Sequence, residues 1–141
     1  MKPCGLGARD SLRLEAGLML YGNDLDDDTT PYEAPLKWTV DLRKEFVGRE
    51  ALLRQAPRKT LTGFELLEAG VPRHGNKVLV EGREAGVVTS GGFSPTLQKS
   101  IGLAYVPVAH PRELKIQVRQ GKEAAAACVG TRFYRRQKNG G

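Results

Sequence analysis

The chain has 141 residues, of which 40% are hydrophobic and 27% are charged, and its formal net charge is +6. This length suits one ordinary domain, or one domain with a piece of another, and the composition is that of a globular protein with a real core. No apolar run approaches the ~20 residues that a membrane span needs, and the first residues lack the apolar segment of a signal peptide. We therefore expect a cytoplasmic protein with two reduced cysteines and no membrane partner.

Half of the net charge lies at the C-terminus, where Arg135, Arg136 and Lys138 contribute +3 of the total of +6. Without these residues the chain is only mildly basic and shows no basic face. We expect residues 135–141 to form a basic disordered tail. Binding to nucleic acid is therefore not favoured.

The first part of the chain, residues 1–56, reads as helices and loops. Its pattern predicts an amphipathic helix over Ala8–Ala16, which Gly17 ends as a left-handed C-cap. Thr30-Pro31-Tyr32-Glu33 is a capping box with proline at the first helical position, and it predicts a short helix that begins at Pro31. A further helix is expected over Gly48–Gln55, just before a junction at Gln55-Ala56-Pro57-Arg58.

From Lys59 onward the pattern changes to short strands separated by glycine turns. The predicted strands are Thr60–Leu67, Val78–Val80, Glu84–Thr89, Ile101–Val106, Leu114–Arg119 and Glu123–Val129. Six such strands fit a small antiparallel barrel or sandwich. Ala124–Ala127 is a run of strong helix formers, yet the hairpin spacing after Gly121 favours a strand there.

No metal site and no catalytic residue is predicted. Asp24, Asp26 and Asp28 alternate like the start of an EF-hand loop, but Thr29 and Pro35 stand where that loop needs glycine and glutamate. A solvated acidic loop is the favoured interpretation.

The remaining candidates for chemistry lack partners in the sequence. His74 and His110 each lie beside turn residues, and Ser90 and Ser94 have no visible base. We therefore interpret the histidines as turn or surface residues and predict no nucleophilic triad.

Ala8–Val40 resembles, nearly residue for residue, the segment that opens the C-terminal part of the aminomethyltransferase family, the T-proteins of the glycine cleavage system. The resemblance continues through Phe46–Leu52 and Thr89–Leu97 and covers almost all of residues 5–134. It implies a mainly β (α+β) fold in which short helices precede a small six-stranded antiparallel β-barrel. The implied domains are the tail of a folate-binding domain over 1–56, the C-terminal barrel over 57–134, and the tail over 135–141.

The resemblance also implies a reaction, glycine catabolism by transfer of a methylene unit. The unit moves from an aminomethyl-lipoyl carrier protein to tetrahydrofolate, giving methylenetetrahydrofolate and ammonia. In this family the essential carboxylate lies in the N-terminal part, which the sequence does not contain. We expect a fragment, or one subunit of a split enzyme whose N-terminal half is a separate partner, and little or no transfer activity from this chain alone.

Three residues match folate-site positions of the family: Arg9, Trp38 and Phe133. Spacing alone allows two interpretations of Arg9. It is either a surface residue, or its planar guanidinium binds a carboxylate or the polar edge of a heterocycle. Trp38 by itself is more typical of a core than of a ligand platform. The resemblance favours cofactor binding for both residues. It also favours cofactor binding for Phe133, within Thr131-Arg132-Phe133-Tyr134. Where the family has tyrosine at this position, phenylalanine lacks the hydroxyl that could donate a hydrogen bond.

Further matches to the family are interpreted as structural, in helix pairing, loop closure and a salt bridge that holds the barrel to its neighbour. These residues are Glu15, Tyr21, Asn23, Asp24, Arg49 and Arg73.

Two alternative functions remain. One is a related folate-dependent one-carbon domain, as in sarcosine or dimethylglycine oxidation or sulfonium demethylation. The other is a non-catalytic barrel that binds a partner, such as RNA, through its basic end.

Overall fold

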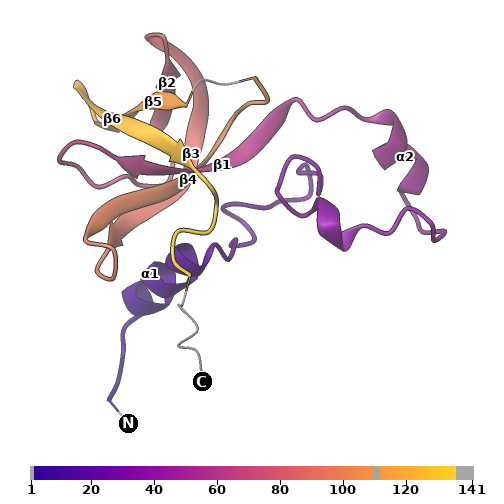
Figure 1. Cartoon of the computed structure of the whole chain (residues 1–141), viewed down its shortest axis with the longest axis horizontal. Helices are drawn as coiled ribbons and strands as arrows, with labels where there is room; N and C mark the ends of the chain where they lie inside the picture. The colour runs from indigo at the N-terminus through magenta and orange to yellow at the C-terminus, as the bar shows by residue number, and fades with distance from the viewer. Residues whose placement is uncertain (1, 110–111, 136–141) are drawn as a thin grey trace.

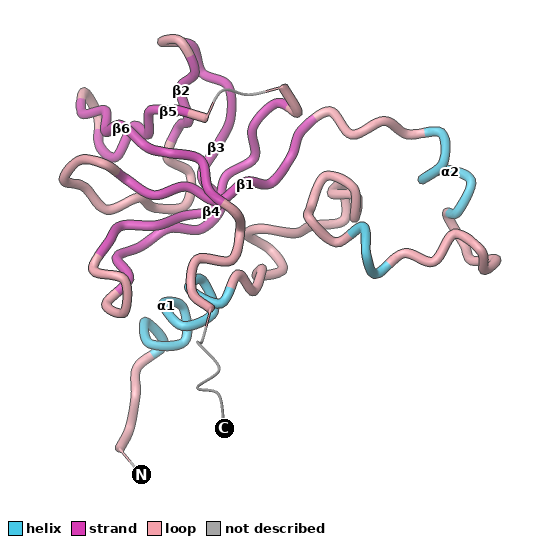
Figure 2. Tube along the Cα trace, in the orientation of Figure 1, coloured by secondary structure: helices cyan, strands magenta, loops and turns pink. Residues whose placement is uncertain are grey.

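The computed structural model describes residues 2–109 and 112–135. Three short helical elements come first: α1 (Leu6–Ala16), the 3-10 helix η1 (Lys37–Thr39) and α2 (Arg49–Arg54). The strands follow: β1 (Lys59–Leu66), β2 (Lys77–Val80), β3 (Arg83–Ser94), β4 (Lys99–Pro107), β5 (Glu113–Arg119) and β6 (Lys122–Val129). Figures 1 and 2 show a barrel with α1 against its lower side and a segment carrying α2 that extends away from it.

The six strands form a closed barrel in the order β1-β4-β3-β2-β5-β6. Every neighbouring pair is antiparallel, and β1 closes the barrel by pairing with β6, as in Phe64 opposite Cys128. The predicted six-stranded antiparallel barrel and the mainly β fold class are therefore confirmed. The turns are also as expected, because Glu81, Gly82 and Gly121 adopt the positive φ that tight hairpins require.

One strand is much longer than the sequence pattern predicts. β3 does not end at Thr89 but continues through Gly91 and Gly92, which pair with Gly102 and Ile101 of β4. The two glycines follow a bulge between Val88 and Ser90 and stay in the ladder. The long β3–β4 hairpin that results reaches beyond the barrel toward α1, with which β3 is in contact.

The alanine run forms a strand, as the hairpin spacing predicted. Ala124 and Ala126 are fully buried inside the barrel, and β6 is paired on both sides, with β5 and β1. Small methyl groups fit the barrel interior beside larger side chains, and the two ladders satisfy the backbone. Tertiary context thus overrides the helical propensity of these residues.

The core has two parts. Inside the barrel lie fully buried Phe64, Val78, Val88 and Ile116 with their neighbours. A second cluster lies between the barrel and the lead-in and consists of Leu14, Leu61, Ile101, Leu103 and Tyr105, with Met19, Leu97 and Phe133 against it. Strands β1 and β4 are therefore covered on both faces, and α1 is held to the barrel by apolar contacts.

The lead-in confirms two of the three predicted helices, as α1 and α2, and corrects the third. α1 ends at Ala16, and Gly17 adopts the left-handed conformation with φ 75° as expected. The capping box also forms: the Thr30 N–H donates to Glu33 Oε2 at 3.1 Å, and the Glu33 N–H donates to Thr30 Oγ1 at 3.3 Å. The helix predicted from Pro31 does not follow, because Pro35 has no N–H to continue it, and the capping box closes a single turn.

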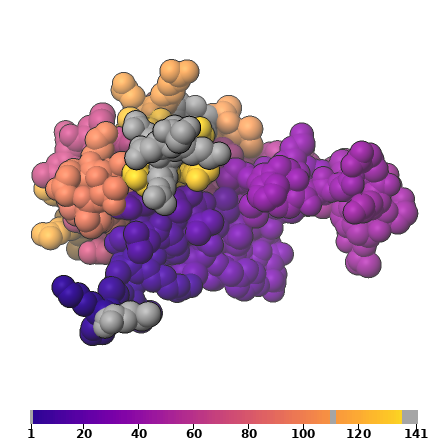
Figure 3. Space-filling model, turned by 60° about the horizontal axis from the view of Figure 1, so that its bottom comes forward, coloured from indigo at the N-terminus to yellow at the C-terminus, as the bar shows by residue number. Residues whose placement is uncertain are grey.

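The segment around α2 projects from the body of the molecule (Figure 3). α2 buries none of its residues, and Val47 and Leu53 nearby are strongly exposed. Within residues 2–109 and 112–135, no helix has the length and apolar character needed to cross a membrane.

Candidate functional site

The junction between the lead-in and the barrel is organised around Asp24, whose side chain is buried with 1% of its surface exposed. Its Oδ1 accepts hydrogen bonds from Thr89 Oγ1 at 2.6 Å and Ser90 Oγ at 2.7 Å. Its Oδ2 accepts from the Arg13 guanidinium at 3.0 Å and from the Leu20 N–H at 2.9 Å. The expectation of a solvated acidic loop is therefore wrong for Asp24, because four donors from three segments surround it.

Arg13 is the cation of this cluster, and its side chain is 12% exposed. Its Nη1 reaches Asp24, its Nη2 donates to Ser90 Oγ at 3.1 Å, and its Nε donates to Asp10 Oδ1 at 2.9 Å. The planar fork thus joins α1, the acidic loop and β3. Both ion pairs of Arg13 lie within the lead-in, and its link to the barrel is the hydrogen bond to Ser90. Among the described residues no ion pair joins the lead-in to the barrel, so the predicted salt bridge between the two is not found.

Glu15 makes a second connection between α1 and the β3–β4 hairpin. Its Oε1 accepts from Ser94 Oγ at 2.6 Å, and its Oε2 accepts from Thr96 Oγ1 at 2.8 Å. Burial alone would raise the pKa of Glu15, but hydrogen bonds from Ser94 and Thr96 outweigh it and lower this pKa below its ordinary value. The carboxylate therefore stays ionised. The backbone oxygen of Glu15 also accepts from the Tyr134 N–H at 2.8 Å, which brings the C-terminal segment to the same helix.

Tyr105 lies beneath this junction. Its hydroxyl donates to the backbone oxygen of Asp24 at 3.0 Å, and Lys59 Nζ lies 4.4 Å from the centre of its ring. Burial raises the pKa of Tyr105 to about 12, so the phenol keeps its proton as a donor at neutral pH.

The three predicted folate residues lie on different parts of the lead-in and the C-terminal segment. Arg9 is exposed on α1, and within the described residues its side chain makes no hydrogen bond or ion pair. Trp38 lies in η1 with 82% of its surface exposed, so it is not a core residue. Phe133 is half-buried against the cluster that contains Leu61 and Ile101. A joint role for these three residues in cofactor binding stays a prediction.

A cavity of about 470 Å³ lies between α1 and β3. Asp10, Ser11 and Arg13 line it from the helix, and Arg73 and His74 line it from the loop before β2. The His74 Nδ1 lies 2.8 Å from the backbone oxygen of Thr89, which fits the interpretation of this histidine as a turn residue. None of the three predicted folate residues, Arg9, Trp38 and Phe133, lines this cavity. The sequence gives no indication that a cavity forms at this place.

Of the other residues interpreted as structural, Tyr21 and Arg49 make local contacts, whereas Asn23 reaches β3. The Tyr21 hydroxyl donates to Asp27, and Arg49 Nε donates to the backbone oxygen of Leu42 at 2.8 Å. The Asn23 side-chain amide is 3.5 Å from the backbone oxygen of Thr89. These bonds close the acidic loop and the segment before α2.

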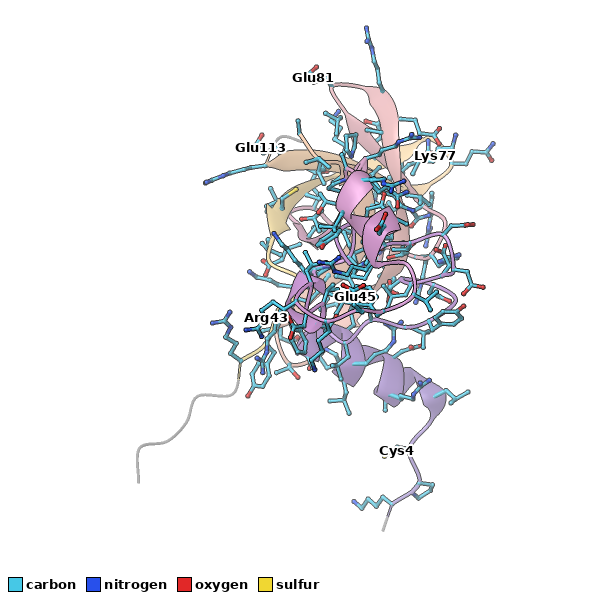
Figure 4. All side chains as sticks on the ribbon, turned by 90° about the vertical axis from the view of Figure 1, so that its right-hand side faces the viewer. Cys4, Arg43, Glu45, Lys77, Glu81 and Glu113 are labelled. Atoms are coloured by element: carbon cyan, nitrogen blue, oxygen red, sulfur yellow. The ribbon has the colours of Figure 1, made fainter. Side chains whose placement is uncertain are left out.

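No residues in the described part of the chain form a group of three or more His, Cys, Asp or Glu side chains able to hold a metal ion. Cys4 and Cys128 are not joined in a disulfide, and Figure 4 shows Cys4 on the stretch before α1, far from the barrel. His110 lies outside the described residues.

Comparison with known proteins agrees with this architecture. Residues 59–135 match the family model of the glycine cleavage T-protein C-terminal barrel domain, and residues 1–44 match that of the GCVT N-terminal domain. The aminomethyltransferase of Rubrobacter xylanophilus is 53% identical over 97% of this chain and 38% of its own length. That of Symbiobacterium thermophilum is 50% identical over 94% of this chain and 37% of its own length.

A solved structure shows the same likeness. The crystal structure of glycine cleavage system aminomethyltransferase T from Bartonella henselae superposes with a TM-score of 0.83 at 38% identity, and the match covers 92% of this chain and 39% of that one. The chain thus spans about two fifths of the length of the relatives it matches. From the match of its barrel to the family model and its identity to these relatives, the chain belongs to the glycine cleavage T-protein family.

Proposed function

We propose that this chain supplies the C-terminal part of a glycine cleavage system aminomethyltransferase. The complete enzyme transfers a methylene unit from an aminomethyl-lipoyl carrier protein to tetrahydrofolate and releases ammonia. The observation that carries the proposal is the identity of 50–53% to relatives named aminomethyltransferase, sustained over 94–97% of the chain. Identity at this level extends across both the lead-in and the barrel.

Within that enzyme, Arg9, Trp38 and Phe133 contribute to the tetrahydrofolate site. Two properties of the structure support this role for Arg9 and Trp38. The Arg9 guanidinium has no partner of its own among the described residues, and the Trp38 indole is 82% exposed. A guanidinium fork suits the polar edge of a pteridine, and an indole suits its flat face. Phe133 offers an apolar edge only.

The rest of the family's enzyme is the partner that covers the lead-in, whether it belongs to the same polypeptide or to another one. Large apolar side chains are unusually exposed before β1: Leu6, Leu12, Leu18, Tyr21, Trp38, Val47 and Leu53. A group of exposed apolar residues of this kind is typical of a surface that another part of a protein buries. The projecting segment around α2 in Figure 3 belongs to this surface.

Tetrahydrofolate should quench the fluorescence of the chain in a saturable way, because Trp38 is its only tryptophan. Arg9→Ala should weaken binding about tenfold or more, since a charge-assisted hydrogen bond is lost. Trp38→Ala removes the signal, so its binding is measured by titration calorimetry, where a similar loss is expected.

The matched control for these variants is Arg83→Ala, an exposed arginine at the β2–β3 hairpin. This variant should bind tetrahydrofolate like the unmodified chain. Equal affinities for the unmodified chain, Arg9→Ala and Trp38→Ala would contradict the assignment of the two residues to the folate site.

Residues 1–141 alone should show no transfer from an aminomethyl-lipoyl carrier, because the family resemblance places the essential carboxylate in a part of the relatives that this sequence does not match. Ammonia release with carrier and tetrahydrofolate measures the reaction. Adding a polypeptide that corresponds to the unmatched part of a relative should restore turnover. Appreciable ammonia release by the chain alone would refute the expectation.

A further inference from the structure

A groove of about 700 Å³ opens at the end of the barrel where β1 ends and β6 begins. Three connections form its walls: the loop after β1 with Glu68 and Arg73, the β3–β4 hairpin with Phe93 and Lys99, and the β5–β6 hairpin with Arg119 and Lys122. This volume is within the ~300–1,000 Å³ that small-molecule sites occupy.

The groove carries an excess of positive charge. Four cations line it, and Glu68 is the only carboxylate among its lining residues. Lys99 is paired with Glu65 at 2.6 Å, whereas Arg73, Arg119 and Lys122 make no ion pair within the described residues. Three guanidinium or ammonium groups are thus available to a ligand.

Arg119 lies directly opposite Lys122 at the β5–β6 hairpin. Three lysines on the strands are instead paired with a glutamate of a neighbouring strand: Lys77 with Glu84 at 2.6 Å, Lys99 with Glu65 at 2.6 Å and Lys115 with Glu123 at 3.1 Å. Like charges directly opposite in an antiparallel pair are destabilising. A bound anion between these two side chains would relieve the repulsion that the hairpin otherwise carries.

The groove is also preformed. The Ser100 hydroxyl donates to the backbone oxygen of Gly70 at 2.6 Å, and the Ala125 N–H donates to Glu68 Oε2 at 3.0 Å. The loop after β1 is therefore tied to β4 and β6, and Glu68 is engaged with the backbone rather than with the cations. Little ordering entropy would be lost when a ligand enters.

Apolar side chains make up most of the remaining lining, beside Gln98 and Ser100. The Phe93 ring is 47% exposed and Val71 is 39% exposed, although both lie within the groove rather than on an open surface. An exposed phenyl ring beside arginine side chains suits a ligand that presents a flat or apolar body together with its charges.

We propose that this groove binds a small molecule that carries at least two anionic groups, carboxylate or phosphate, on a compact body. One anionic group is held between Arg119 and Lys122, another by Arg73, and the body lies against Phe93. This site is separate from the proposed folate residues, since none of Arg9, Trp38 and Phe133 lines the groove.

Titration calorimetry on the 141-residue chain tests the proposal with three probes: citrate, benzene-1,3,5-tricarboxylate and tripolyphosphate. At least one probe should bind saturably with one-to-one stoichiometry, and the comparison separates carboxylate from phosphate ligands. The double variant Arg119→Ala/Lys122→Ala should weaken that binding about tenfold or more, because charge-assisted hydrogen bonds are removed. Arg73→Gln, in a different loop, should also weaken binding of the probe. This variant tests the proposal if Arg119→Ala/Lys122→Ala does not fold.

The control is Lys77→Ala/Lys115→Ala, which removes the same number of charges from exposed strand positions outside the groove. Figure 4 shows Lys77 on the barrel surface, well away from α1. The control should bind like the unmodified chain. The proposal is overturned if the control loses as much affinity as the groove variants or if no probe binds saturably. It is also overturned if only a hexaglutamate peptide binds, which would indicate a protein partner instead.

Discussion

Asp24→Ala should lower the free energy of unfolding by about 3–5 kcal/mol, the usual cost of removing one partner from a buried ion pair. The change leaves the Arg13 guanidinium, 12% exposed, without its buried carboxylate, and it deprives the hydroxyls of Thr89 and Ser90 of an acceptor. Urea unfolding followed by circular dichroism gives the change in free energy. Amide hydrogen exchange should also accelerate in α1 more than in β1, because the lost bonds join α1 to the acidic loop and that loop to β3.

Asp28→Ala is the matched control, since Asp28 lies in the same loop with an exposed side chain. Its effect should stay within about 0.5 kcal/mol, as is usual for surface positions. If the two substitutions changed the free energy of unfolding equally, the assignment of Asp24 as the centre of the junction would be wrong.

Phe64→Ala should cost about 3–5 kcal/mol, because the ring is fully buried inside the barrel and its removal leaves a cavity. The surrounding strands have little freedom to collapse into it. The ring packs so closely on β4 that a Cβ placed on Gly102 would come within 2.4 Å of it. The hydrogen bonds between β1 and β4 hold both strands in place. Thermal and urea unfolding of the variant measure the loss.

For comparison, Phe93→Ala removes the same side chain from β3, where the ring is 47% exposed. We expect it to destabilise the chain by less than half as much as Phe64→Ala. Similar losses at the two positions would mean that Phe64 is not the central residue of the barrel core.

Local sequence signals account for most of the architecture. The glycines at positions 17, 82 and 121 each mark an end or a turn, and the structure places a positive φ at all three. The strand boundaries follow from such turns and from alternation of apolar residues. The helix predicted from Pro31 was wrong, because a capping box indicates where a helix starts and not how long it continues.

Burial of polar groups could not be predicted in the same way. Nothing near Asp24 in the sequence distinguishes it from Asp26 or Asp28, since its partners Thr89 and Ser90 lie 65 and 66 residues later. The basic groove was missed for the same reason, as its cations come from three separate connections of the barrel. Arg9 and Trp38 are candidates for the folate site through the family resemblance. The chemistry of their side chains alone does not decide between a structural role and a binding role.

The distance in sequence between α1 and its docking partners has a consequence for how the protein is made. α1 is synthesised before the barrel, and although Arg13 can already reach Asp24, its partner on β3 is Ser90. The donors to the Glu15 side chain, Ser94 and Thr96, also come from the β3–β4 hairpin. At a synthesis rate of ~5–20 residues per second, the nascent helix must wait several seconds for β3 to leave the ribosome. During that interval its apolar face is open to chaperones, and a helix that is made before the barrel is anchored only after β3 has been made.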